Sequence, residues 1–347
     1  MKLDKSFWSD KKILVTGHSG FKGSWLSCIL KYLNCKVWGL SDGKTQSDNY
    51  ILMDKEEIFE KEFKLDISAS KSLGRIMQNN FDFVFHLAAQ GLVSKAKENP
   101  RETVSSNVLG TFNILDWINN IPEIPCLIIA TTDKVYSNPS IDNTENSPLG
   151  GDELYSATKS ASEHIIRAFS NTLKRKSLNI GVIRSGNVLG GGDGASDRIV
   201  TDLLDSLKNK TEIILRNPEA IRPWQYIMDS LHGYLLAAEY CYKSRVDEIF
   251  NLNSEKNNSL TVRDVAESLI NFWGNNRNYI ITEVPSKLKE TSILTINSRK
   301  AYNLLGWSAS HDINSIAKNT IEWEKSKLEG INITFNQIKD HFDLTRS

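Results

Sequence analysis

The chain has 347 residues, 40% hydrophobic and 24% charged, a balance typical of a globular protein with one large or two modest domains. Its 42 basic residues equal its 42 acidic residues, so net charge does not favour binding to nucleic acid or to an anionic membrane. The N-terminal stretch is charged and lacks the apolar core of a secretory signal, and no apolar run reaches the roughly 18 residues of a membrane span. We therefore expect a cytoplasmic protein with neither a nucleic-acid nor a membrane partner.

The four cysteines are widely spaced, and they form neither a C-x-x-C pair nor a zinc-binding pattern. They are Cys28, Cys35, Cys126 and Cys241. A chain of this size does not need disulfide bonds to fold, so we expect reduced thiols and no metal site.

Short apolar runs alternate with helical patterns through the first half of the chain. Strands are expected at residues 12–16, 36–40, 63–66, 81–87, 126–130 and 179–183. Helices are expected at residues 24–33, 70–78, 101–119 and 155–172. Alternating strands and helices, with strands apolar on both faces, predict an α/β fold with a doubly wound parallel sheet of the Rossmann type.

The regular alternation of strands and helices ends after Arg184. A glycine-rich loop at residues 190–194 precedes expected elements at 197–208 (helix), 212–216 (strand), 248–252 (strand) and 315–328 (amphipathic helix). Thr261 and Asp264 fit a capping box that opens a helix ending near Trp273. The expected division is a dinucleotide-binding domain at 1–185, to which 225–255 returns, and a smaller discontinuous substrate lobe at 186–224 and 256–347.

A glycine turn, Gly17-x-x-Gly20-x-x-Gly23, separates the first expected strand from the first expected helix. Gly17 permits a tight turn, Gly20 admits a pyrophosphate close to the backbone, and Gly23 lets the helix pack against the strand. The helix N-terminus then offers N–H groups to phosphate, and Lys22 can add positive charge there. This arrangement predicts a bound nicotinamide dinucleotide.

The residues after the second expected strand leave the choice between NAD and NADP open. Asp42 can bind the adenosine ribose, but Ser41 can occupy the decisive position instead, and Lys44 can favour a 2′-phosphate. Asp66, after the third expected strand, can accept a hydrogen bond from the adenine amino group or can cap a helix.

Tyr155 and Lys159 are four residues apart on an expected helix and so share one face. A lysine ammonium beside a phenol stabilises the phenolate and lowers its pKa. Tyr155 can then take the proton of a sugar hydroxyl while hydride leaves the same carbon, and Lys159 can bond the nicotinamide ribose.

Thr132, Asp133 and Lys134 follow the fifth expected strand, where parallel sheets open their ligand crevice. An acid beside an amine suits an elimination next to a ketone. Asp133 can protonate the departing C6 hydroxyl if burial raises its pKa. Lys134 can remove the C5 proton if burial or Lys159 lowers its pKa.

These residues resemble the extended short-chain dehydrogenase/reductase superfamily, and within it the CDP-glucose 4,6-dehydratases. The likeness covers almost the whole chain and is most specific at Phe21-Lys-Gly-Ser-Trp-Leu26 and Arg222-Pro-Trp-Gln225. It also includes Phe85-His-Leu-Ala-Ala-Gln-Gly-Leu-Val93, Asn107-Val-Leu-Gly-Thr111, Arg184-Ser-Gly-Asn-Val-Leu-Gly-Gly-Gly-Asp193 and Leu305-Gly-Trp307. Most relatives with dTDP- or GDP-sugar substrates carry an Asp-Glu or Ser-Glu pair where this chain has Asp133-Lys134.

The resemblance implies an NAD-dependent hydro-lyase that converts CDP-glucose, or a close nucleotide hexose, to the 4-keto-6-deoxy sugar for deoxysugar and surface-polysaccharide synthesis. It implies the catalytic residues Thr132, Asp133, Lys134, Tyr155 and Lys159. It implies the cofactor-binding residues Gly17, Ser19, Gly20, Phe21, Lys22, Gly23, Asp66, Ile67, Leu87, Ala88, Ala89, Asn107, Tyr155 and Lys159. It also implies the substrate-binding residues Gln90, Asn187, Arg198 and Arg222.

The chain departs from the family pattern before the catalytic tyrosine, at Asp152-Glu-Leu154, and also at Gly194 and Val135. These departures leave the hexose and the base open. The helices at 101–119 and 155–172 match those that pair across the dimer in this superfamily, so a homodimer or homotetramer is expected. Two other functions remain as rivals, a nucleotide-sugar 4-epimerase and a catalytically idle dinucleotide-binding regulatory protein.

Overall fold

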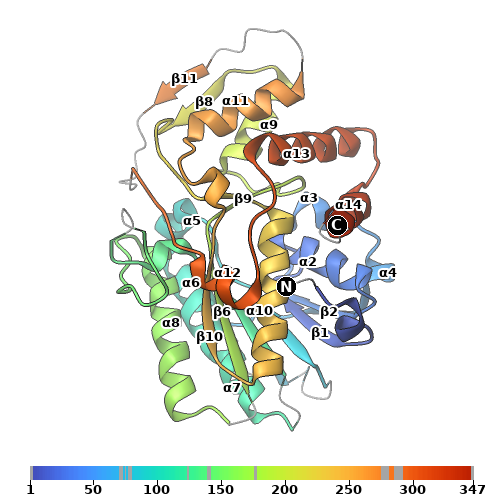
Figure 1. Cartoon of the computed structure of the whole chain (residues 1–347), viewed down its shortest axis with the longest axis vertical. Coiled ribbons are helices and arrows are strands. Elements are labelled where there is room, and N and C mark those ends of the chain that lie inside the picture. The colour runs from blue at the N-terminus through green and yellow to red at the C-terminus, as the bar shows by residue number, and fades with distance from the viewer. Residues whose placement is uncertain are drawn as a thin grey trace.

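The computed structural model describes residues 3–69, 73–74, 76, 80–122, 125–138, 142–175, 178–274, 281–284 and 292–344. Its centre is a seven-stranded parallel sheet in the order β10-β6-β5-β4-β1-β2-β3 (Figure 1). These strands are β1 (Lys12–Thr16), β2 (Lys36–Ser41), β3 (Phe59–Lys64), β4 (Phe83–His86), β5 (Cys126–Ala130), β6 (Asn179–Ser185) and β10 (Glu248–Leu252). The strand order reverses between β1 and β4, where ligands of doubly wound sheets bind.

Two apolar layers sandwich the sheet because alternate side chains along each strand point to opposite faces. Ile13 and Val15 of β1 pack with α2 (Phe21–Tyr32) and α10 (Ile227–Ser244). Leu14, between them, packs on the other face with α7 (Gly110–Asn120) and α8 (Leu154–Thr172). The continuous apolar runs of the sequence therefore correspond to strands buried on both sides, as predicted.

The remaining elements are shorter or lie in a second lobe. They are α1 (Lys5–Trp8), α3 (Asp48–Leu52), α4 (Lys55–Ile58), α5 (Val93–Glu98), α6 (Pro100–Val104), η2 (Ser105–Leu109), η3 (Asp133–Val135), β7 (Asn187–Leu189), α9 (Ile199–Asn209), β8 (Ile213–Arg216), β9 (Trp224–Tyr226), η4 (Glu255–Asn257), α11 (Val262–Trp273), β11 (Ile281–Val284), α12 (Arg299–Leu305), α13 (Ile313–Leu328) and α14 (Thr334–Leu344).

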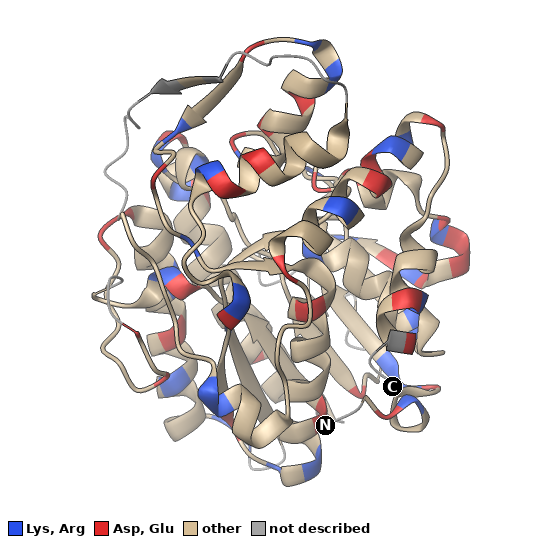
Figure 2. Cartoon of the chain, turned by 45° about the horizontal axis from the view of Figure 1, so that its top comes forward, with Lys and Arg blue, Asp and Glu red and all other residues tan. Residues whose placement is uncertain are grey.

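The second lobe lies above the carboxyl ends of the sheet strands in Figure 1. There, β8 pairs with β11 in parallel, and α9, α11 and α13 pack together near them. The last helix, α14, returns to the main body and packs against α2. Basic and acidic side chains are interspersed over the helices of both parts (Figure 2). Among the described residues, no helix combines the length and hydropathy needed to cross a lipid bilayer.

The predicted fold class is confirmed, and most predicted elements are present with shifted ends. The strand expected at 63–66 is wrong in position, because β3 runs over Phe59–Lys64. The helix expected at 101–119 is interrupted by one π-helical stretch at Ser105–Leu109. The helix expected at 70–78 falls mostly outside the described residues. The capping box of Thr261 and Asp264 is present at the start of α11.

Candidate active site

The glycine turn connects β1 to α2 beside the loop that follows β4. Gly17 has a φ of +73°, and a Cβ there would lie 2.7 Å from the backbone nitrogen of Ala88. A Cβ on Gly23 would lie 2.1 Å from the carbonyl oxygen of Gly17, so the helix reaches this loop only because that residue lacks a side chain. Gly20 caps α2 without a side-chain hydrogen bond, which leaves first-turn N–H groups to a phosphate. The turn therefore fits a dinucleotide pyrophosphate.

Acidic residues follow β2 and β3 at the carboxyl edge of the sheet. Asp42 accepts a hydrogen bond from the backbone of Lys44, whose amine lies 3.2 Å from Glu102 and 3.5 Å from Asp42. These two carboxylates would repel a 2′-phosphate, so the surroundings of Lys44 favour NAD over NADP. Asp66 accepts hydrogen bonds from both the backbone and the hydroxyl of Ser68.

Tyr155 lies in the first turn of α8, with Lys159 one turn further along. Glu153 caps this helix by accepting hydrogen bonds from the backbone nitrogens of Tyr155 (2.7 Å) and Ser156 (2.8 Å). The departure from the family pattern at this point thus supplies an N-cap that fixes where the tyrosine begins its helix.

We expected Lys159 to lower the pKa of Tyr155, and this lowering is not found in the protein without its cofactor. Burial raises the pKa of Tyr155 to about 12, although a hydrogen bond with Thr132 opposes the shift. The Lys159 amine donates to the carbonyl oxygen of Ala130 at 3.0 Å. Burial also lowers the pKa of Lys159 to about 8, which the charge of Glu163 partly offsets.

Thr132, Asp133 and Lys134 form the turn that leaves β5. The Thr132 hydroxyl donates to Asp133 Oδ1 at 2.9 Å, whereas Asp133 Oδ2 is buried without a partner. Burial raises the pKa of Asp133, and the charges of Lys134 and Arg222 work against this shift. Asp133 therefore has the raised pKa that its predicted role as an acid requires.

Several cations converge on Asp133 and Tyr155. Burial, with the charges of Arg198 and Lys159, lowers the pKa of Lys22 to about 7, while Asp133 opposes that shift. The Lys22 amine donates to the Ser185 hydroxyl at 3.3 Å. Residues from the glycine turn, β5, α8 and the second lobe thus share one electrostatic environment.

Two predicted ligand residues, Gln90 of the loop after β4 and Asn107 of η2, bind other protein groups. Asn107, 1% exposed, accepts from the backbone nitrogen of Gln90 (2.8 Å) and donates to Thr158 (3.0 Å). The amide of Gln90 bonds the backbone of Leu92 and the hydroxyl of Thr103. In this geometry both side chains fix the loop beside α8, so their influence on a ligand would pass through the position of that loop.

The predicted substrate arginines lie close enough to act on charged groups of the site, Arg198 on Lys22 and Arg222 on Asp133. Arg198 is half-buried, pairs with Asp193 at 2.6 Å, and would lie 3.9 Å from a Cβ on Gly91 of the β4 loop. Arg222 is 5% exposed and donates to the carbonyl oxygen of Ile221. Asn187 is half-buried at the start of β7.

Sequence reasoning missed a buried network behind the catalytic helix. Arg184 binds Glu163 with its Nε 3.0 Å from both carboxylate oxygens, and Thr131 donates to the same carboxylate at 2.7 Å. Arg184 also donates to the Tyr136 hydroxyl at 2.8 Å. The signal was the spacing of Glu163, which lies four residues after Lys159 and so shares its helix face.

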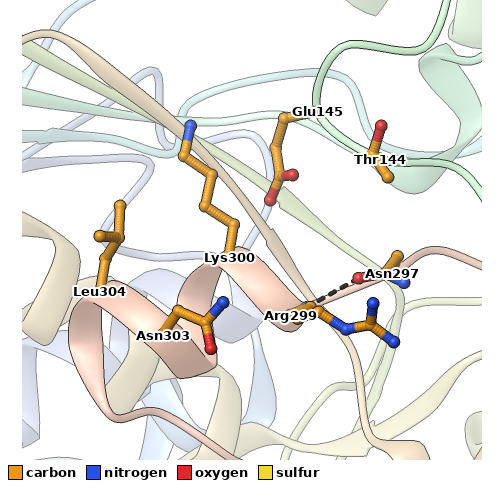
Figure 3. A pocket seen from close by; sticks show the side chains of 7 residues that line it. All are labelled: Thr144, Glu145, Asn297, Arg299, Lys300, Asn303 and Leu304. Atoms are coloured by element: carbon orange, nitrogen blue, oxygen red, sulfur yellow. Dashed lines mark hydrogen bonds between the residues drawn. The ribbon is translucent and has the colours of Figure 1, made fainter.

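A separate surface pocket of about 370 Å³ is lined by α12 and the loop before α8 (Figure 3). Its lining residues are Thr144, Glu145, Asn297, Arg299, Lys300, Asn303 and Leu304. None of the predicted site residues lines it.

The four cysteines are free, as predicted, and all four are buried.

The fold and the glycine turn define a dinucleotide-binding protein with a polar crevice at the carboxyl ends of its strands. Residues 13–252 match the model of the NAD dependent epimerase/dehydratase family, and the chain belongs to that family. The prediction that the cofactor is NAD is confirmed by this family match.

Known proteins similar to this chain include both dehydratases and epimerases. The chain is 30% identical to a CDP-glucose 4,6-dehydratase of Salmonella typhimurium, over 99% of each chain. It is 26% identical to a dTDP-glucose 4,6-dehydratase of Haemophilus influenzae, covering 90% of this chain and 97% of that one. A crystal structure of a dTDP-glucose 4,6-dehydratase of Bacillus anthracis in complex with NAD shares the fold, with a TM-score of 0.77 at 22% identity, over 92% of this chain and 97% of the other.

Proposed function

We propose that this protein catalyses the NAD-dependent 4,6-dehydration of a nucleotide hexose, with CDP-D-glucose as its substrate. The observation that carries this proposal is Asp133 beside Lys134 at the end of β5, with a buried, unpartnered carboxylate oxygen and a raised pKa. An epimerase has no use for an acid–base pair dedicated to elimination. The 30% identity to a CDP-glucose 4,6-dehydratase over 99% of both chains supports the choice of base.

The cofactor would lie along the Gly17–Gly23 turn, with Lys159 at its nicotinamide ribose. When bound, NAD⁺ accepts a hydride from the sugar and later returns it, and its positive charge favours the Tyr155 phenolate. This contribution would oppose the burial that raises the pKa of Tyr155 to about 12 in the protein without cofactor. The further residues proposed at the cofactor are Ser19, Phe21, Lys22, Asp66, Ile67, Leu87, Ala88, Ala89 and Asn107.

Tyr155 takes the proton of the C4 hydroxyl as that carbon becomes a ketone, and Thr132 orients the phenol. The ketone makes the C5 proton acidic, and Lys134 removes it. Asp133 delivers its proton to the C6 hydroxyl, which departs as water, so the C5–H and C6–O bonds break and a C5–C6 double bond forms. A proton returned to C5 by Lys134, together with the hydride that the bound cofactor would return to C6, would complete the 4-keto-6-deoxy sugar.

The second lobe, built around α9, β8, α11 and α13, would hold the nucleotide. Arg198 and Arg222 suit a diphosphate because a guanidinium can bond two phosphate oxygens at once. Arg198 would exchange Asp193 for the phosphate, and Asn187 and Gln90 would lie toward the sugar. Replacing Arg198 by alanine should therefore raise KM by at least about tenfold with a smaller change in kcat.

The experiment that tests this function incubates purified protein and NAD⁺ separately with CDP-, dTDP-, GDP- and UDP-glucose, and follows product mass. We expect turnover to be fastest with CDP-glucose and the product to be one water lighter. Products of unchanged mass would support a 4-epimerase. The absence of both turnover and bound nucleotide would support a non-catalytic regulatory protein.

We also propose that the chain forms a homodimer through α7 and α8. Val104, Leu109 and Phe112 are 42%, 47% and 38% exposed along this part of the molecule. Light scattering should give twice the chain mass, and Phe112→Glu should lower it to that of one chain. A mass of four chains would indicate a homotetramer.

A further inference from the structure

A group of titratable side chains, Asp229, His232, His311 and His341, lies where α14 meets α10. We call it the histidine cluster. Asp229 and His232 are one turn apart on α10, His311 precedes α13, and His341 belongs to α14. Asp229, His311 and His341 each offer a ligand atom, and these three atoms lie within 4.8 Å of one another.

Hydrogen bonds within the protein account for part of this cluster. Asp229 accepts from the backbone nitrogens of Ser310 and His311, each at 3.1 Å, and from the Ser310 hydroxyl at 2.7 Å. Its Oδ2 also lies 3.1 Å from His311 Nδ1. These contacts explain the positions of Asp229 and His311 as anchors of the loop before α13.

The same contacts leave His341 unexplained. This residue is 3% exposed, and both of its ring nitrogens are buried without a hydrogen-bond partner. His232 Nε2 is also buried without a partner. Burying unpaired polar atoms is unfavourable, so a partner for these nitrogens would stabilise the fold.

The spacing of the rings suits a common ion. Imidazoles that ligate one tetrahedral zinc through bonds of about 2.0–2.1 Å place their ring centres roughly 5 Å apart. The ring centroids of His311 and His341 are 5.5 Å apart, as are those of His232 and His341.

We propose that Asp229, His311 and His341 bind one divalent transition-metal ion of the zinc class, with His232 as the nearest further ligand. Two imidazoles and a carboxylate are donors that zinc prefers, and the carboxylate compensates part of the ion's charge. Asp229 Oδ2 and His311 Nδ1 are 3.1 Å apart, already the separation of neighbouring zinc ligands. The rings of His311 and His341 are stacked at an interplanar angle of 17°, so His341 must rotate to direct a nitrogen at the same ion. His311 is the half-buried member and gives the ion a path from solvent.

Such an ion would tie the last helix to α10 and to the loop before α13. None of its ligands belongs to the residues assigned to dehydration. The site would therefore stabilise the attachment of α14 without taking part in the reaction.

Calorimetric titration of the tag-free, chelator-treated full-length protein with Zn²⁺ tests this proposal. We expect one site per chain with a Kd of about 1 μM or tighter, and a visible tetrahedral spectrum when Co²⁺ replaces Zn²⁺. His341→Ala should weaken binding at least about tenfold, and His164→Ala, an exposed histidine of α8, should leave it unchanged.

Circular dichroism of each variant shows whether it folds. If His341→Ala does not fold, His311→Ala tests the same site from its half-buried side. Wild-type protein without a stoichiometric site, or zinc affinity unchanged in the folded ligand variants, would overturn the proposal.

Discussion

Two polar regions lie along the face of α8 that carries Tyr155, Lys159 and Glu163. They differ in how completely their charged groups are hydrogen-bonded. At the far end of this face, Glu163 and Arg184 are 4% and 2% exposed, and two further side chains, Thr131 and Tyr136, form hydrogen bonds with this pair. At its near end, Asp133 is 1% exposed and one of its carboxylate oxygens has no partner. The saturated pair stabilises the helix position, whereas the open carboxylate is left for a substrate.

The largest expected effect is at the open end. Lys134→Met should reduce dehydration about 10²–10⁴-fold, because it removes the proposed base at C5. Cofactor binding should not change, since the substitution leaves the glycine turn intact. Parallel measurement of product mass and of NAD⁺ affinity separates the two effects, and unchanged turnover would remove Lys134 from the mechanism.

The next effect concerns the saturated end. Glu163→Gln should destabilise the protein by about 3–5 kcal/mol, because it leaves the buried Arg184 without its counter-charge. Urea unfolding gives the free energy directly. Glu322→Gln, in an exposed i,i+4 pair with Lys318, is the matched control and should cost at most about 0.5 kcal/mol. Equal losses of unfolding free energy for the two variants would show that the buried Glu163–Arg184 pair is no more important for stability than an exposed pair.

A smaller effect of opposite sign is expected for Asp133→Asn. Because burial raises the folded pKa of Asp133 above 3.8, its stabilising contribution is present below that pH and is lost as pH rises through the folded pKa. Asparagine cannot ionise, so the variant should be more stable than wild type at pH 8, on the order of 1 kcal/mol. The difference should shrink toward pH 4 in unfolding experiments, while activity is lost. Greater stability of the wild type at pH 8 would show that the carboxylate is well paired.

The smallest effect is expected at the N-cap. Glu153→Ala should cost about 1 kcal/mol by removing the acceptor for the backbone nitrogens of Tyr155 and Ser156. Glu153→Asp keeps a capping carboxylate and should recover most of that loss. Thermal unfolding of both variants measures the effect, and equal melting temperatures would deny Glu153 a capping role.

The sheet and its cofactor turn could be predicted because their signals are local. The strands at 12–16 and 126–130 contain continuous apolar runs, and the structure places β1 and β5 on those residues. The predicted strand at 248–252 is also present, as β10. The glycine spacing encodes a backbone approach that only glycine permits. The capping box at Thr261 is likewise contained in four residues.

The rest depends on contacts between distant parts of the sequence. The pairing of Arg184 with Glu163 and the contact of α14 with α2 follow from tertiary packing, which periodicity does not encode. The helix α10 is buried along most of its length and therefore lacks the polar face that marks an amphipathic helix. The raised pKa of Tyr155 reflects burial, which the Tyr-x-x-x-Lys spacing does not contain.

The most direct test of the central claim uses CDP-glucose labelled with deuterium at C4. The account predicts a product one water lighter that carries the deuterium at C6, since the hydride removed from C4 is returned there. Tyr155→Phe should give neither water loss nor deuterium transfer. A product of unchanged mass with deuterium still at C4, or a dehydrated product without deuterium at C6, would contradict it.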